Sequence, residues 1–180
     1  MPAPIQPHLV SPNIGNYYVG RGIVSIQLPG EIGFTDAGNA PLFEFQAKPT
    51  LLNHFSSRIG VRTKDLVVVT ELDATITMQL DELTARNMAF ALLGIPQESG
   101  KVDIHMFDQP LYYAAIKFVG TNVAGPQWTF TFPLVIITPN KAMSLISAGS
   151  GAWGTIDLQA DVLKDTTTGQ FCIAEATDFV

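Results

Sequence analysis

The sequence predicts a mainly β fold, a β-sandwich or partial barrel with one flanking α-helix, in a single domain spanning residues 1–180. Three observations favour this class. Apolar and polar residues alternate with a period of two in several segments, turn residues separate short β-rich segments, and one segment has the composition of a helix. Many short strands joined by turns are typical of sandwiches and barrels.

The clearest predicted strand covers residues 65–80. From Leu72 onwards, apolar side chains alternate without a break with polar ones, so the two sets lie on opposite faces. Residues 154–163 alternate in the same way. Each strand should therefore have one dry face and one wet, acidic face, the wet positions being Glu71, Asp73, Thr75, Thr77 and Gln79 in the first strand and Asp157, Gln159 and Asp161 in the second.

The remaining elements follow from composition and turn signals. Residues 31–41 have the composition of a loop, and residues 108–110 should link two neighbouring strands as a short hairpin. Further strands are expected at residues 17–28, 42–47, 102–107, 111–119, 127–138 and 170–176.

The predicted helix covers residues 81–93. Asp81 can cap the free N–H groups of the first turn, and Glu82 suits the positive end of the helix dipole. Gly94 should end the helix, and Pro96 prevents its continuation.

Residues 48–64 show no clear period and contain Pro49 and Gly60, so they are expected to form a long extended loop between two strands. Loops longer than about 12–15 residues are uncommon in compact domains and are usually functional. With about 3.3 Å per residue, such an arm would reach roughly 25–30 Å from the domain.

Composition favours an oligomer and disfavours nucleic-acid binding. Charged residues are 14% of the chain, against about 25% in average soluble domains, so a monomer would expose much neutral surface. The net charge of −6 opposes attractive binding to phosphates, although DNA could still slide past such a surface. Cys172 is the single cysteine, residues 1–10 lack the basic region of a signal peptide, and no apolar run approaches the ~20 residues of a membrane span. We expect a soluble protein made in a cytoplasm, without a membrane partner.

No pattern of catalytic or metal-binding residues stands out. His8, His54 and His105 lack metal-site spacing, and Gly149–Gly151 lacks the flanking glycines of a nucleophile elbow. Glu71 and Asp73 lie two residues apart on one strand, and a second strand repeats this acidic and polar pattern at Asp157 and Asp161, which favours a solvated surface over a catalytic pocket. The sequence predicts no enzyme activity, no cofactor and no metal.

Several segments together resemble the major tail tube proteins of long, non-contractile bacteriophage tails. The likeness runs from residue 17 to the end and depends on the order and spacing of the segments. They are LNHFSSR at 52–58 with GVRTKD at 60–65, LTARNMAFALLG at 83–94, WGTIDL at 153–158 with VLKD at 162–165, and GQF at 169–171.

This resemblance implies six subunits per ring and rings stacked into a hollow tube within the virion, assembled in the cytoplasm of a bacterial host. Strands of neighbouring subunits would extend one another into a continuous inner barrel, and the long loop would reach the adjacent ring. Tape measure protein would fill the lumen before DNA passes without specific binding, and tail-tip and tail terminator proteins would cap the tube.

Two sets of residues acquire expected roles. The eight wet positions named above should line the lumen, because like charge prevents adhesion to phosphate. The arm should contact the next ring, with basic side chains meeting acidic groups and apolar ones supplying packing. The arm residues are Leu51, Leu52, His54, Phe55, Arg58, Arg62 and Lys64.

Three alternatives stay open. The closest is the inner tube of a contractile tail or a type VI secretion ring. A monomeric carbohydrate-binding or adhesion β-sandwich is the second, although such modules usually present clustered exposed aromatic residues and only Trp128 and Trp153 are available as tryptophans. An enzyme is the third and has the least support.

Overall fold

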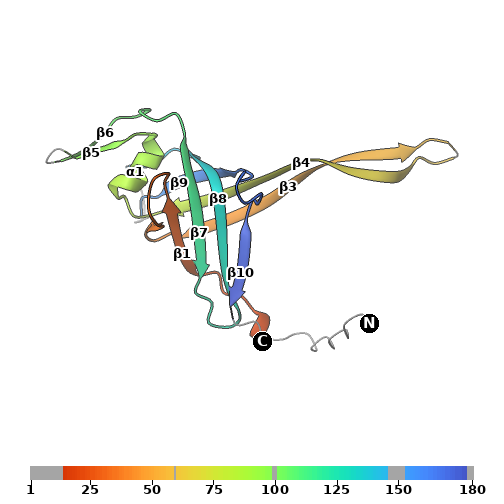
Figure 1. Ribbon diagram of the computed structural model, residues 1–180, viewed down its shortest axis with the longest axis horizontal. Coiled ribbons are helices and arrows are strands. Elements are labelled where there is room, and N and C mark those ends of the chain that lie inside the picture. Colours follow the sequence, from red (N-terminus) through yellow and green to blue (C-terminus); the bar gives the residue numbers. More distant parts are fainter. Residues whose placement is uncertain (1–13, 59, 99–100, 146–152, 178–180) are drawn as a thin grey trace.

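The computed structural model describes residues 14–58, 60–98, 101–145 and 153–177, which fold into mainly β structure with one short α-helix (Figure 1). A 3-10 turn at Ile14–Asn16 precedes the strands, and α1 is Ala85–Leu92. The strands are β1 Gly22–Gln27, β2 Thr35–Asp36, β3 Leu42–Ser56, β4 Thr63–Leu80, β5 Pro96–Glu98, β6 Val102–Ile104, β7 Tyr112–Gly120, β8 Gln127–Pro139, β9 Ile156–Val162 and β10 Ile173–Thr177.

Eight strands form one antiparallel sheet in the order β2-β1-β7-β8-β9-β4-β3, with β10 paired to β8. The sheet folds back on itself, so β3 packs over β7 and β8. The rings of Phe43 and Phe118 stack with centroids 5.3 Å apart, and those of Phe45 and Phe130 are 5.1 Å apart. The predicted mainly β fold, a sandwich or partial barrel with one helix, is confirmed.

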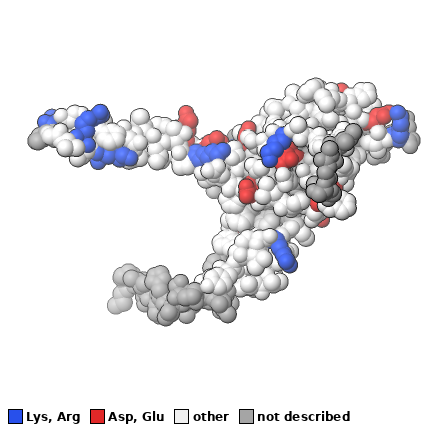
Figure 2. Space-filling view, turned by 180° about the vertical axis from the view of Figure 1, so that it is seen from behind, with Lys and Arg blue, Asp and Glu red and all other residues white. Residues whose placement is uncertain are grey.

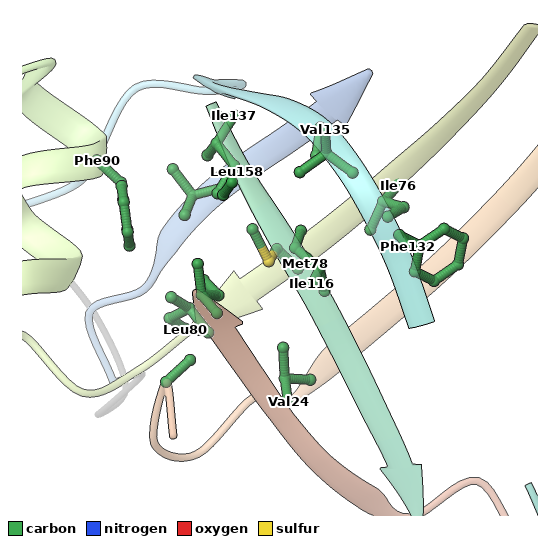
Figure 3. Packing of buried hydrophobic residues seen from close by; sticks show 14 of the residues in the cluster. Val24, Ile76, Met78, Leu80, Phe90, Ile116, Phe132, Val135, Ile137 and Leu158 are labelled. Carbon is green, nitrogen blue, oxygen red and sulfur yellow. The ribbon is translucent and has the colours of Figure 1, made fainter. Parts of the chain in front are cut away.

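The core lies between the two halves of this folded sheet (Figure 3). The alternation is confirmed for all of β9 and for β4 from Ile76 to Leu80, where the apolar side chains are buried and the polar ones are not. Leu72, at the start of the predicted apolar set, is instead 65% exposed, because it lies on the part of β4 that projects from the body. Phe90 of α1 closes one end of the core, where its ring meets Tyr112 edge-on at 5.0 Å. The buried side chains include Val24, Ile26, Ile76, Met78, Leu80, Ile116, Phe132, Val135, Ile137, Ile156 and Leu158.

Truncation of Phe132 should be strongly destabilising. Its ring is 1% exposed and contacts both Phe43 and Phe45. Phe132→Ala should lower the free energy of unfolding by about 3–5 kcal/mol, through lost transfer energy and the cavity left behind. Urea unfolding followed by circular dichroism measures this. Ile32→Ala, at a fully exposed side chain, should change it by less than about 0.5 kcal/mol, and equal losses in both variants would contradict the assigned core.

The helix is shorter than predicted, and both of its expected caps were wrong. Thr84 is the N-cap, and its hydroxyl accepts a hydrogen bond from the Asn87 N–H at 3.1 Å. Asp81 is occupied elsewhere, because its carboxylate accepts from the Asn39 side chain at 2.6 Å. Leu93 takes the left-handed conformation at the C-terminus with φ 50°. Gly94 instead permits close packing, since a Cβ there would lie 2.3 Å from the His105 carbonyl oxygen.

Two other predicted elements are corrected. The strand expected at residues 102–107 is the three-residue β6, which pairs with β5 in a separate two-stranded sheet rather than with β7. The strand expected at residues 17–28 is confined to β1. Residues 17–19 leave the sheet because Asn122 binds their backbone, accepting from the Val19 N–H at 3.1 Å and donating to the Tyr17 carbonyl at 2.9 Å.

An ion pair fastens the turn after β1 to the helix. Arg86 donates to both carboxylate oxygens of Glu31 and, at 3.0 Å, to the Ile26 carbonyl. These hydrogen bonds, with one from the Leu28 N–H at 2.7 Å, outweigh partial burial and lower the pKa of Glu31 to about 2.

Stability should therefore depend on the charge of Glu31. Because its pKa in the folded state is below its ordinary value near 4.5, the stabilisation is complete above about pH 5 and is lost as pH falls towards 2. Glu31→Gln should lower stability at pH 7 and flatten this part of the pH profile, measured by urea unfolding between pH 2 and 7. If the pH profile of Glu31→Gln is as steep as that of the control Glu175→Gln, at an exposed residue, the Arg86–Glu31 ion pair does not have this role.

Candidate assembly surfaces

The long loop predicted at residues 48–64 is instead the outer part of a β-hairpin. β3 and β4 pair from Leu42 and Gln79 at the base to Ser56 and Thr63 near the tip. Within the described residues, β9 pairs with β4 only over positions 75–80, so beyond this point the two strands project from the body as a free-standing arm (Figure 1). Twelve residues of β4 in this part give the arm a length of about 40 Å.

Two irregularities in the strand pairing explain why the sequence pattern did not predict this hairpin. The pairing register shifts between Thr50 and Leu51 and again between His54 and Phe55. Each shift moves the following side chains to the other face, which breaks the period of two. Pro49 is tolerated because β3 is an edge strand.

The arm exposes a large amount of apolar surface. Two-stranded hairpins are marginally stable alone, and extended apolar patches mark surfaces that contact other molecules. Leu52 is 63% and Leu72 is 65% exposed. The exposed apolar side chains of the arm are Leu51, Leu52, Phe55, Val61, Leu66, Val67, Val68, Val69 and Leu72.

The basic arm residues gather at the far end of the hairpin, as Figure 2 shows. Arg58 and Arg62 lie in the turn and Lys64 begins β4. The Arg62 guanidinium lies 5.4 Å from the centroid of the Phe55 ring. His54 Nδ1 is 2.6 Å from Asp65 Oδ1 across the two strands. The structure thus places all seven predicted arm residues on the outer half of the hairpin.

Six of the eight predicted wet positions come together on one sheet face. In the register of β4 with β9, Thr75 pairs with Asp161, Thr77 with Gln159 and Gln79 with Asp157. Gln79 donates to Asp157 at 2.7 Å, and Gln159 donates to Asp161 at 3.1 Å. Glu71 and Asp73 lie further along β4, beyond the end of β9, where both are exposed.

β3 extends this polar face, which sequence reasoning missed. Glu44 pairs with Thr77 and Gln46 pairs with Thr75, so both side chains share the face with the wet positions. The alternation of residues 42–48 was a sufficient signal. Beyond β3 no further strand is hydrogen-bonded among the described residues, so its outer edge is unpaired.

Below the base of the arm lies an aromatic cleft of about 800 Å³, which sequence reasoning also missed. It forms where β3 crosses the ends of β7 and β8. Its lining combines six aromatic rings with a polar margin, from Tyr18, Phe43, Glu44, Phe45, Gln46, Lys48, Thr75, Thr77, Phe118, Trp128, Phe130 and Gln159. The alternation of Trp128, Phe130 and Phe132 was its signal in the sequence.

Other candidate groups do not join these surfaces. In the described ranges, no three His, Cys, Asp or Glu side chains lie together as a metal site would need. Cys172 packs against the core, and burial raises the pKa of its thiol. No helix in the described part of the chain is long and apolar enough to span a membrane. His8 and Gly149–Gly151 lie outside the described residues.

Comparison with known sequences finds a matching sequence family. Residues 17–102 are similar to a sequence family described as a protein of unknown function, UCP028589. That segment contains β1 to β5, α1 and the first residue of β6, and so includes the whole arm. No curated protein matches the chain.

Proposed function

We propose that this chain is the structural subunit of a bacteriophage tail tube, polymerising as stacked hexameric rings into a hollow conduit for DNA. The observation that carries the proposal is the arm. A hairpin about 40 Å long, exposed along its length and rich in apolar side chains, requires a partner surface in its working state.

Two further features support assembly from copies of one chain. In the part of the chain that the structure describes, no strand pairs with the outer edge of β3, so this edge can accept a strand of a neighbouring subunit and thereby lose its tendency to aggregate. The basic end of the arm complements a chain whose net charge is −6, so a neighbouring copy is an electrostatically suitable partner.

The polar face supports the role of a conduit. The strands that carry it are the ones next to the free edge, so extension of the sheet by neighbouring subunits would continue this face around a ring. Six copies of net charge −6 give about −36 per ring. DNA and the tape measure protein would pass along a wet, acidic wall that does not attract phosphate. Tail-tip and terminator proteins would bind the exposed ring at each end.

The same geometry would serve the inner tube of a contractile tail or a type VI secretion ring. A monomeric carbohydrate-binding module is favoured by one observation, the aromatic cleft, because sugars stack on exposed rings. Such a module needs no apolar arm, and the two functions differ in whether the chain polymerises.

Sedimentation velocity of the purified chain over a hundredfold concentration range tests the proposal. The tail-tube function predicts boundaries with sedimentation coefficients far above that of a 19.4 kDa monomer. These coefficients should increase with protein concentration or when tail-tip complex is added. A single monomer boundary under all of these conditions would reject it in favour of the binding module.

A further inference from the structure

The aromatic cleft is an incompletely covered part of the core. Trp128, Phe130 and Phe132 alternate along β8 and lie on the same face. The Trp128 and Phe130 rings stack with centroids 5.9 Å apart, and Phe130 also lies 6.3 Å from the Phe118 ring of β7. Phe132 is fully buried beneath β3, whereas Trp128 and Phe130 are only half-buried. The difference arises because β3 leaves the body for the arm after Phe45, so no strand of the described chain covers the lower rings.

The chemistry of the cleft suits a proline-rich peptide. Flat aromatic rings packed side by side form the grooves that recognise proline-rich segments, while neighbouring polar groups bind the exposed carbonyls of such segments. The cleft carries one acidic and one basic side chain, Glu44 and Lys48, so its lining has no net charge. An uncharged, proline-rich occupant fits this balance better than a charged one.

Residues 1–13 of this chain have that composition. They include Pro2, Pro4, Pro7 and Pro12, contain no Asp, Glu, Lys or Arg, and place two prolines three positions apart, at the repeat of a polyproline helix. At about 3.1 Å per residue, thirteen residues span up to about 40 Å in that conformation.

The residues that follow this segment are held beside the cleft. Asn122 fixes the backbone of residues 17–19 to the loop that precedes β8. Tyr18, within that fixed stretch, lines the cleft itself. Residue 13 is therefore five positions from a cleft residue, and a tether this short gives an effective concentration in the millimolar range.

We propose that the proline-rich segment 1–13 docks in the aromatic cleft of its own chain, with its prolines against the rings of Tyr18, Trp128 and Phe130. The docked segment covers the lower part of the core that β3 leaves open. It also lies beside the free edge of β3, so it shields the subunit where a neighbouring strand would add.

Shielding of Trp128 from iodide tests this docking. Trp153→Phe, at a side chain 87% exposed, leaves Trp128 as the single tryptophan of the full chain. In this background, Pro4→Ser with Pro7→Ser should raise the iodide quenching constant of Trp128 at least twofold and shift its emission to the red. The matched control Gln6→Ser, in the same segment, should leave both unchanged. Equal quenching in all three proteins would overturn the proposal.

Dilution distinguishes docking of the segment in its own chain from docking in a second copy of the chain. Docking within one chain predicts a quenching constant that is independent of protein concentration across the fraction that elutes as monomer. Shielding that disappears on dilution would overturn docking within one chain and assign the segment to a second copy. Because the readout comes from the unassembled subunit, failure here leaves tube formation to be decided separately by sedimentation.

Discussion

Leu52→Glu with Leu72→Glu should abolish tube formation while leaving the body of the subunit folded. Both side chains are more than 60% exposed on the arm and lie outside the core, so their replacement does not disturb the folded sheet. In an assembled tube each would be buried against a neighbour, contributing about 1.5–3 kcal/mol. Losing both, and burying charge instead, should weaken association by at least about 100-fold per subunit contact.

Negative-stain images and thermal unfolding measure these two effects separately. Leu52→Met with Leu72→Met is the matched control, since it keeps apolar surface at both positions, and it should assemble normally. The glutamate variant should melt within about 2 °C of the parent, because the melting transition reports the body. Normal tubes from the glutamate variant would mean that the arm has no role in assembly.

Asp161→Lys should convert an inert conduit into one that holds DNA. Asp161 is exposed on β9, where it pairs with Thr75 and accepts a hydrogen bond from Gln159 on the polar face. The substitution changes the charge of each subunit by +2, or about +12 per ring of six. Phosphate attraction of this kind falls steeply with added salt, so tubes of the variant should retain duplex DNA at low ionic strength and release it at high ionic strength.

The control for this prediction carries the same charge change elsewhere. Asp108 is exposed in the loop between β6 and β7, away from the polar face. Tubes of Asp108→Lys should bind DNA no better than the parent in a filter-retention assay. If both variants bind equally, total charge rather than position decides the outcome, and the polar face is not the lumen wall.

The alternation of apolar and polar residues predicted the core strands of this fold well. The strict alternation predicted the buried side chains of β9 and of β4 from Ile76 to Leu80, because there one face packs on the core and the other is exposed to solvent. It failed at Leu72, which is exposed because β4 has already left the body for the arm. The register of β4 with β9 then brought the two wet sets together, which the matching patterns had suggested but could not establish.

The errors arise from interactions and irregularities that the local pattern of residues does not record. Asn39 engages Asp81, which left Thr84 to cap the helix. The loop prediction for residues 48–64 fails because two register shifts in the pairing of β3 with β4 erase the period that a strand should show. The aromatic cleft depends on β3 crossing β7 and β8, an arrangement that no local pattern encodes.

Negative-stain electron microscopy of the purified full chain, concentrated and then supplied with tail-tip complex, tests the central claim most directly. Polymerisation into a conduit predicts rings with a central hole, and stacked rings that form a hollow tube of constant diameter. Dispersed particles of the size of one chain under both conditions would contradict the claim and make the arm a surface for some other partner.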